Sequence, residues 1–147
     1  MTHEIQECLE AIKFCNQFCM FSLYDLRDIS NASKDQFKVT KQSFNVRDAI
    51  KEVLNMYKMQ ANLKNIQIYS NVSLTMPLTL ITDKTRMQQI ISNLLSNAIK
   101  FSEADTEVIL KYEHYPREEL LQIKVYDHGI GISYDDAAKI FKPFVTL

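Results

Sequence analysis

The sequence predicts an α+β fold, a two-layer sandwich of helices on a mixed sheet, preceded by a long amphipathic helix. Residues 1–29 repeat apolar side chains at helical spacing, residues 84–101 do so over a shorter span, and two runs after residue 106 alternate apolar with polar side chains as strands do. At 147 residues, the chain is long enough for one domain with its own core and an attached element.

The overall charge and hydropathy exclude two classes of partner. The net charge is -1, with 17 Lys and Arg against 18 Asp and Glu, so the chain lacks the basic excess that binds a nucleic-acid backbone. Asn16 and Gln17 interrupt the most apolar stretch, which predicts no membrane-spanning segment. The start of the chain also lacks a signal-peptide pattern. We therefore expect a cytoplasmic fragment that binds neither nucleic acid nor the membrane interior.

The first thirty residues carry an apolar seam with alternating spacings of three and four. Its members are Ile5, Cys8, Ile12, Cys15, Cys19, Ser22, Leu26 and Ile29. Four further residues are predicted to widen it: Leu9, Phe14, Phe18 and Phe21. Such a seam is typical of a helix that packs against other helices. The alternative is a single amphipathic helix that lies on its own domain.

The three cysteines are predicted to be structural. Cys8, Cys15 and Cys19 are separated by seven and four residues, which places them on one face of a helix. Metal sites instead pair closely spaced cysteines with a second cluster. We expect small buried apolar side chains, and an odd number of cysteines argues against a disulfide framework.

A compact domain is predicted after a polar linker at residues 30–35. Residues 37–39 and 42–44 look extended, and Asn45 can cap a helix with Asp48 in its first turn. The buried face of that helix is predicted to contain Val46, Ala49, Ile50, Val53, Leu54, Tyr57 and Ala61. Residues 62–65 break the helix, residues 66–72 alternate as a strand, and residues 78–81 form a second short apolar run.

The next helix, from Asp83 to Phe101, carries two unusual amides. Asn93 and Asn97 lie one turn apart, and asparagine is a poor helix former. We expect Gln89 and Lys100 on the same polar side. The core-facing side is predicted to contain Ile90, Ile91, Leu94, Leu95, Ala98 and Phe101. Oxygen ligands in a polar cleft suit Mg²⁺ and the phosphates that it accompanies.

Two alternating runs, residues 107–112 and 121–126, predict an antiparallel hairpin. Asp127 follows directly where the second strand ends, a position at which ligand-binding loops collect. Gly129 and Gly131 are the two glycines of the chain. Their spacing indicates a backbone with positive φ or a close approach to a ligand, and a tight turn without a ligand is the alternative.

These segments resemble the ATP-binding domain of histidine kinases, a Bergerat-type fold in the superfamily of gyrase, Hsp90 and MutL ATPases. Residues 88–101 resemble the N box, residues 83–89 its usual lead-in, and Asp127–Gly131 the G1 box. Residues 140–144 resemble the F box. Three motifs in this order are far more specific than a lone Asp-x-Gly-x-Gly, whose residues are common in turns.

The resemblance implies ATP and Mg²⁺ as cofactors. It implies that the Asn97 oxygen coordinates Mg²⁺ and that Asn93 lies beside it as a polar contact or orients a water. Gyrase-like relatives have a glutamate at the Asn93 position that activates water, and an amide cannot accept that proton. Transfer to a protein histidine is therefore expected, with poor hydrolysis. Lys100 would offset phosphate charge, and Phe101 would lie near the base or in the core.

Further roles follow from the same resemblance. The Asp127 carboxylate would accept a hydrogen bond from the adenine amine, and Gly129 and Gly131 would shape the loop around the nucleotide. Phe141 and Phe144 would anchor the base of an ATP lid. No motif supports a catalytic role for His128.

The resemblance also implies a domain organisation. Residues 1–31 would be the second helix of a dimerisation bundle that forms a homodimer, residues 32–45 a linker and first strand, and residues 46–147 an ATPase domain. That domain would stop before the lid and the G2 box, and no phosphoacceptor H box is expected at His3 or His114. We therefore expect no autophosphorylation by this fragment alone. The expected function is the ATP-binding part of a sensor histidine kinase whose full-length partner is a response-regulator receiver domain. The alternative is a non-catalytic dimerisation or regulatory module.

Overall fold

The computed structural model describes residues 3–32, 39–137 and 139–140. Its elements are α1 (His3–Ala32), β1 (Gln42–Asn45), α2 (Val46–Leu63), β2 (Gln67–Val72), β3 (Thr79–Thr82), α3 (Lys84–Phe101), β4 (Glu107–Tyr115), β5 (Leu120–Tyr126) and α4 (Tyr134–Ala137). The predicted α+β class is confirmed, as are the long first helix, the two central helices and the hairpin.

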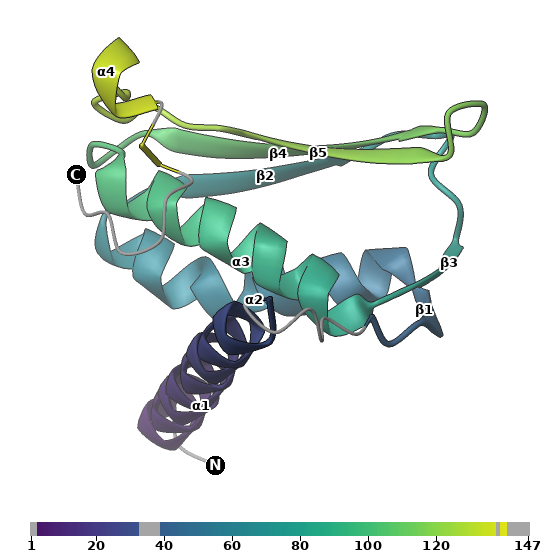
Figure 1. Ribbon diagram of the computed structural model, residues 1–147. Helices are drawn as coiled ribbons and strands as arrows, with labels where there is room; N and C mark the ends of the chain where they lie inside the picture. Colours follow the sequence, from purple (N-terminus) through teal and green to yellow (C-terminus); the bar gives the residue numbers. More distant parts are fainter. Residues whose placement is uncertain (1–2, 33–38, 138, 141–147) are drawn as a thin grey trace.

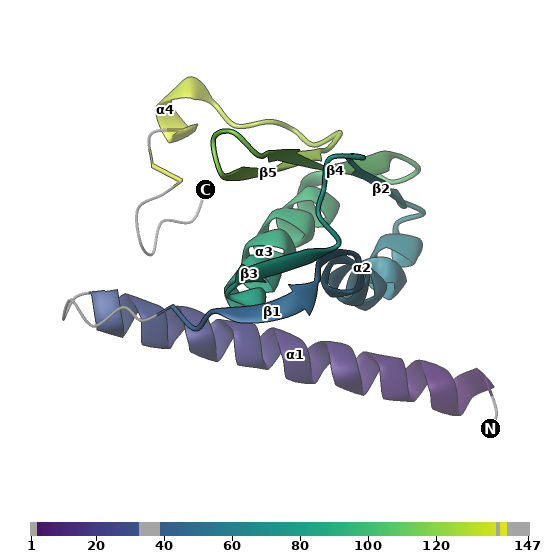
Figure 2. The ribbon, with the colours of Figure 1, turned by 90° about the vertical axis from the view of Figure 1, so that its right-hand side faces the viewer.

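The main sheet has three strands in the order β2-β4-β5. Strand β2 runs parallel to β4, and β4 pairs with β5 antiparallel, so the sheet is mixed as predicted. Helices α2 and α3 cover one face of this sheet, and α1 lies beyond them on the side away from the sheet (Figures 1 and 2). Strands β1 and β3 form a separate antiparallel pair, which the sequence did not predict.

The core lies between the sheet and the two helices. Alternate residues of β4 face it, and Val108, Leu110 and Tyr112 are almost completely buried. Tyr57 of α2 is also buried, and its hydroxyl lies 2.5 Å from the Ser92 hydroxyl of α3. Burial raises the pKa of Tyr57, because the charged phenolate would lose its hydration. The hydroxyl therefore stays protonated and links α2 to α3.

The ends of α2 follow the predicted signals. The Asn45 side chain accepts hydrogen bonds from the backbone amides of Arg47, at 2.9 Å, and Asp48, at 3.3 Å. The helix ends at Leu63, and Asn65 has a φ of 53°, a conformation that asparagine tolerates better than most residues. Both the predicted cap and the predicted break are confirmed.

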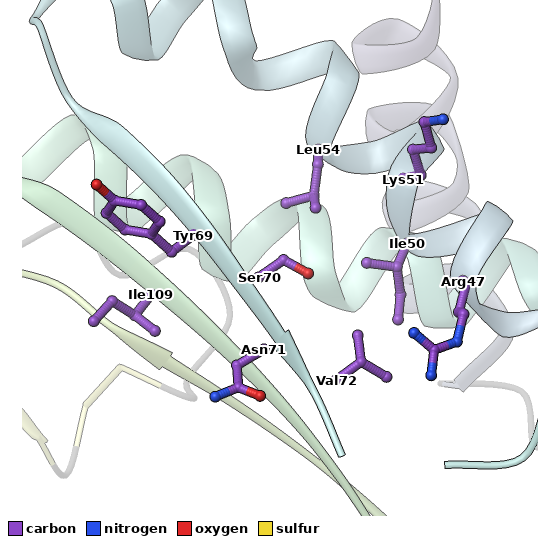
Figure 3. Close-up of a pocket in the computed structure, with 9 residues that line it drawn as sticks. All are labelled: Arg47, Ile50, Lys51, Leu54, Tyr69, Ser70, Asn71, Val72 and Ile109. Atoms are coloured by element: carbon purple, nitrogen blue, oxygen red, sulfur yellow. The ribbon is translucent and has the colours of Figure 1, made fainter. Parts of the chain in front are cut away.

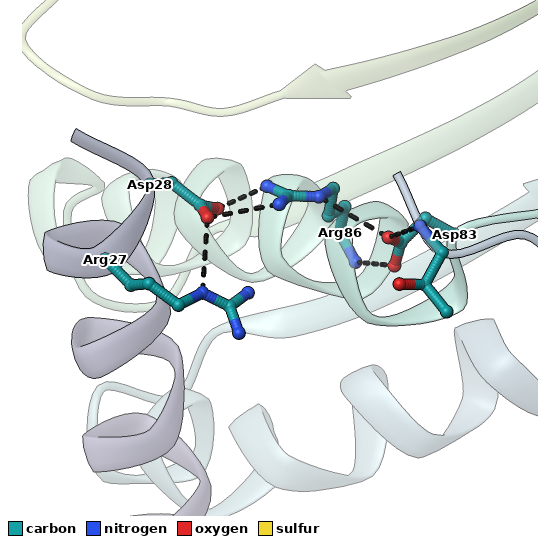
Figure 4. A network of polar contacts seen from close by, with 5 residues as sticks. Arg27, Asp28, Asp83 and Arg86 are labelled. Atoms are coloured by element: carbon teal, nitrogen blue, oxygen red, sulfur yellow. Dashed lines mark hydrogen bonds and ion pairs between the residues drawn. The ribbon is translucent and has the colours of Figure 1, made fainter. Parts of the chain in front are cut away.

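Helix α1 contacts its own domain through two phenylalanines that were predicted to widen the seam. The Phe14 ring packs edge-on against Tyr57, with 5.6 Å between centroids, and Phe21 is 6% exposed. The Asp28 carboxylate forms an ion pair with the Arg86 guanidinium at the start of α3, and Asp83 accepts from the Arg86 amide (Figure 4). The alternative of a helix packed on its own domain therefore describes this side of α1.

The seam itself lies on the opposite side of α1. All its members with described side chains are exposed, from Ile5 and Ile12 to Leu26. The prediction that Cys8, Cys15 and Cys19 are buried is wrong for the single chain, because all three are exposed free thiols. The phenylalanines Phe14 and Phe21 belong to the other face and do not widen the seam. Phe14 and Phe21 are separated by seven residues, as are Cys8 and Cys15 of the seam. The spacing alone therefore does not show which of the two faces contacts the domain.

Candidate functional site

The two asparagines of α3 lie where the sequence placed them, on the exposed side of the helix. Asn93, Asn97 and Lys100 are all exposed, and their spacing brings them to neighbouring turns. The Lys100 ammonium lies 4.7 Å from the centre of the Phe101 ring. This surface therefore offers two amides and one cation to solvent beside an aromatic ring.

The predicted division of α3 into two sides needs correction. Gln89 was expected on the polar side but is only 7% exposed, whereas Ile90, Leu94 and Phe101 were expected in the core but are 57%, 40% and 43% exposed. The apolar part of the buried side of α3 consists of Met87, Ile91, Leu95, Ala98 and Ile99. The buried side is therefore turned around the helix axis relative to the prediction, toward Gln89 and away from Ile90, Leu94 and Phe101.

The buried side of α3 also includes a second glutamine. Gln88, beside Gln89, donates from Nε2 to the Ala49 carbonyl at 3.0 Å and to the Glu52 carboxylate at 2.7 Å. A polar side chain can be buried when such bonds satisfy it. On the exposed side, Asn93 and Asn97 lie among the exposed apolar side chains of Ile90, Leu94 and Phe101. This mixture suits a ligand with both an apolar and a charged part.

The loop after β5 is tied to the end of α3. Ser102 is 4% exposed and forms an isolated β-bridge with Gly129. The His128 backbone amide donates to the Ser102 hydroxyl at 3.3 Å. These contacts hold Asp127 beside the last turn of α3, so residues some thirty positions apart form one surface. Ser102 was not singled out in the sequence, where it is only the first residue after a helix.

Each glycine of this loop has its own structural reason. A Cβ on Gly129 would lie 2.8 Å from Asp127 Oδ1 and 3.1 Å from the Phe101 carbonyl oxygen, so any other residue here would displace the Asp127 carboxylate. Gly131 has a φ of +72°, in the left-handed region that favours glycine. The predicted positive φ is found at Gly131, while Gly129 allows a close approach between the loop and the protein itself.

The Asp127 carboxylate is held by one oxygen. Asp127 Oδ1 accepts a hydrogen bond from the Gly129 amide at 2.8 Å. In the part of the chain that the structure describes, Oδ2 has no protein partner, and the residue is exposed. The loop thus fixes the direction of the side chain and leaves one oxygen for a donor outside the protein.

Lys64 stabilises the end of α3 next to the site, and the sequence did not predict this role. Its ammonium donates to the carbonyls of Ile99, Lys100 and Ser102, at 3.0, 2.8 and 3.1 Å. These carbonyls belong to the end of α3, where no intrahelical donor is available. A positive charge there also favours the helix dipole. Nothing in the sequence directs a lysine of the α2–β2 turn to a helix end so far along the chain.

Two predicted residues, Phe141 and Phe144, lie outside the described residues. Before them, α4 begins at Tyr134, and the hydroxyl of the preceding Ser133 accepts a hydrogen bond from the Asp136 amide at 3.1 Å. Hydrogen bonds from Lys139 and Ser133 lower the pKa of Asp136. Among the described residues, no cluster of three His, Cys, Asp or Glu side chains is suited to a metal. A metal at this site would depend on amide oxygens and on the ligand's own oxygens.

Comparison with known proteins places this arrangement in a family. Residues 82–146 match the family described as histidine kinase-, DNA gyrase B-, and HSP90-like ATPases. Through this segment, which includes α3 and the Asp127 loop, the chain belongs to that family, and it is an ATP-binding domain of the histidine kinase type.

Curated relatives are sensor kinases. The chain is 36% identical over 126 residues to the autoinducer 2 sensor kinase/phosphatase LuxQ of Vibrio vulnificus, covering 84% of the chain and 15% of the relative. It is 32% identical over 140 residues to the sensor histidine kinase RcsC of Escherichia coli, covering 95% of the chain and 14% of the relative. The chain therefore spans about one seventh of the length of these relatives.

Solved structures share the fold. Full-length ShkA in complex with AMPPNP has a TM-score of 0.74 at 25% identity, over 99% of this chain and 31% of ShkA. The histidine kinase AdeS of Acinetobacter baumannii has a TM-score of 0.68 at 22% identity, over 82% of this chain and 57% of AdeS. In the described part of this chain, no helix is long and apolar enough to cross a membrane.

Proposed function

We propose that the exposed side of α3 and the Asp127 loop bind ATP with Mg²⁺, and that a longer sensor kinase uses this site to transfer the γ-phosphoryl group to a protein histidine. Family membership supports ATP as the nucleotide. The relatives are sensor kinases, and the ShkA structure contains AMPPNP. The chain covers a small part of these relatives, and we propose the transfer reaction for a longer kinase that contains this domain.

The chemistry of each side chain fits one part of the ligand. Asp127 would accept a hydrogen bond from the adenine amine, which guanine replaces with an oxygen. Asn97 would offer its amide oxygen to Mg²⁺, a hard cation that prefers oxygen ligands. Lys100 would lie near the phosphates as a point charge. Asn93 would orient a water or phosphate oxygen, and its amide cannot act as a general base.

The observation that carries the proposal is the Asp127 carboxylate. Its Oδ1 is fixed by the Gly129 amide, so the carboxylate needs little reorganisation to bind a donor through Oδ2. An oriented carboxylate can accept a hydrogen bond from the amine of adenine but not from the oxygen that guanine carries at this position. With guanine, two acceptors would face each other and the carboxylate would lose its hydrogen-bond donor. The proposal therefore predicts a preference for ATP over GTP.

Calorimetric titration with ATP and GTP tests this assignment. Asp127→Asn should weaken ATP binding by about 1.5–3 kcal/mol, as expected when a hydrogen bond to a charged group is removed. Asp105→Asn is a matched control, because Asp105 is also exposed but lies in the turn before β4. Equal ATP affinity of the wild type and Asp127→Asn would contradict the proposed role.

The outward seam of α1 supports self-association as part of the same function. Ile12 and Leu26 are 64% and 60% exposed on the side away from the domain, and exposed apolar stripes of this kind mark interfaces. We expect Ile12→Glu with Leu26→Glu to yield a monomer in sedimentation, with Lys13→Glu as the control. An unchanged sedimentation coefficient would contradict homodimerisation through this seam.

A response-regulator receiver domain remains the proposed partner of the full kinase, and the ThkA kinase was crystallised with the response regulator TrrA.

A further inference from the structure

A groove runs between α2 and the outer edge of β2, at the edge of the sheet opposite β5 and the Asp127 loop. It has a volume of about 680 Å³. Ile50 and Leu54 of α2 and Val72 of β2 form its apolar floor, and Arg47 and Lys51 stand on the helix side (Figure 3). The groove contains no residue of the proposed nucleotide site.

Strand β2 presents an unpaired backbone to this groove. The amides of Gln67 and Ser73, one at each end of the strand, donate to carbonyls on the β4 side, at 3.0 and 2.9 Å. Successive residues of a strand direct their backbone groups to opposite sides. Ser70, with Ile68 and Val72, therefore directs its N–H and C=O away from β4, where no described strand pairs with them.

This edge lacks the usual protection against strand addition. Exposed edges are commonly blocked by lysine, proline or charged residues. The six residues of β2, Gln-Ile-Tyr-Ser-Asn-Val, include none of these. Tyr69 and Ser70 are exposed in the middle of the strand. An extended segment of about the same length could therefore pair along its full edge.

The helix wall of the groove is basic. Arg47 and Lys51 lie one turn apart on α2 and are both exposed. Lys58, seven residues after Lys51, continues the same side of the helix and is also exposed. Among the described residues, no carboxylate forms an ion pair with these three cations, whereas Lys84 at the start of α3 pairs with Glu52. The charge of the groove therefore matches an acidic occupant.

We propose that the groove binds an extended acidic peptide segment of a partner protein, which adds to the sheet as a strand beside β2. Backbone hydrogen bonds to Ser70 and its alternate neighbours hold the segment in register. Side chains on its helix side place carboxylates near Arg47 and Lys51 and apolar groups on Ile50 and Leu54. This arrangement is a known mode of peptide recognition, in which the edge gives affinity and the pockets give specificity.

Selection from a random twelve-residue peptide library displayed on phage, with the full 147-residue chain as bait, tests the proposal without nucleotide. Selected peptides should be enriched in Asp and Glu alternating with apolar residues. A fluorescent copy of the strongest binder then reports affinity by anisotropy. Lys51→Glu should weaken its binding about tenfold or more, as expected when an attractive charge becomes repulsive. Lys13→Glu on α1 makes the same charge change and should leave the affinity unchanged.

Ser70→Pro separates strand addition from simple charge attraction. Proline removes the outward amide and blocks pairing at this edge, while the β2–β4 hydrogen bonds remain. It should weaken the peptide about tenfold or more. Thermal unfolding of each variant confirms that the fold is kept, and Lys51→Glu carries the test if Ser70→Pro unfolds.

The opposite results are equally clear. Absence of acidic enrichment among the selected peptides, or binding that Lys51→Glu leaves unchanged, would overturn the proposal. Binding sensitive to Lys51→Glu but not to a folded Ser70→Pro would overturn strand addition. If Ser70→Pro instead abolishes self-association of the chain in sedimentation, a second copy occupies the groove, and the acidic partner is excluded.

Discussion

Leu95 and Leu94 are neighbours on α3, yet Leu95 is fully buried against the sheet while Leu94 is 40% exposed beside Asn93 and Asn97. The buried side of the helix is filled by well-packed apolar residues and by hydrogen-bonded amides. The exposed side combines bare amides, a cation and uncovered apolar side chains. Under the proposed function, α3 stabilises the fold through its buried side and binds the nucleotide through its exposed side, so substitutions on the two sides should change different measurements.

The largest effect should come from the buried side. Leu95→Ala should lower the free energy of unfolding by about 2–5 kcal/mol, because it removes buried methyl groups and leaves a cavity. Leu94→Ala is the matched control on the exposed side and should cost less than about 1 kcal/mol. Urea denaturation measures both. Similar losses for the two variants would show that the two sides of α3 are not distinct.

On the exposed side, Asn97 should affect binding and leave stability unchanged. Asn97→Ala should weaken Mg²⁺-ATP binding by about 1–3 kcal/mol, because it removes an oxygen ligand for the cation. Binding of adenosine, which carries no phosphate, should be unchanged. Calorimetric titrations at several Mg²⁺ concentrations measure this difference. An identical Mg²⁺ dependence in both proteins would make Asn97 an ordinary solvated residue.

The hydrogen bond between Tyr57 and Ser92 joins α2 to the buried side of α3. Tyr57→Phe should lower the free energy of unfolding by about 0.5–1.5 kcal/mol, because it leaves the Ser92 hydroxyl without this partner. Tyr69→Phe removes an exposed hydroxyl of β2 and should change stability by less than about 0.5 kcal/mol. Thermal unfolding compares the two. A neutral Tyr57→Phe would show that the bond between the helices adds nothing to stability.

The smallest effect concerns Glu52, which holds Gln88 and Lys84 on α3. Desolvation raises the pKa of Glu52. The hydrogen bonds from Lys84 and Gln88, together with the charge of Lys84, lower this pKa by a larger total amount, so the net shift is downward. A lowered folded-state pKa contributes stability above the unfolded value of 4.5 that is lost as the pH falls through the folded value. The contribution should be below about 1 kcal/mol because the pair is largely exposed.

Urea unfolding between pH 6 and pH 3, over a range chosen to cross the carboxyl pKa values, checks this linkage. The stability difference between the wild type and Glu52→Gln should shrink as the pH falls. A difference that stays constant or grows toward acid pH would contradict the direction of the shift.

The sequence predicted those parts of the fold that local patterns determine. Alternation in residues 107–112, the Asn45 cap and the break at residues 62–65 all follow from short-range rules, and the structure confirms them. It failed where the outcome depends on how elements pack. Helical periodicity shows that α3 is amphipathic but does not show where its buried side lies around the helix axis, so Ile90 and Gln89 were assigned to the wrong sides.

The candidate site shows the same limit. Asn93 and Asn97 were singled out because asparagine is unusual within a helix, and Asp127 because it follows a strand and begins the Asp-x-Gly-x-Gly motif. Lys64 and Ser102 were not, because their effect depends on contacts between segments far apart in sequence. The groove beside β2 was also not predicted, since an edge strand is defined only by the order of strands in the sheet.

The central claim is that ATP binds to the exposed side of α3 and to the loop after β5. Titration of the ¹⁵N-labelled chain with Mg²⁺-ATP, followed through its backbone amide resonances, tests it most directly. The account predicts the largest shifts at residues 93–101 and 127–131, with those of β2 and its groove nearly unchanged. Shifts confined to the groove of Arg47 and Lys51, or absent from residues 93–101 and 127–131 at saturating nucleotide, would contradict it.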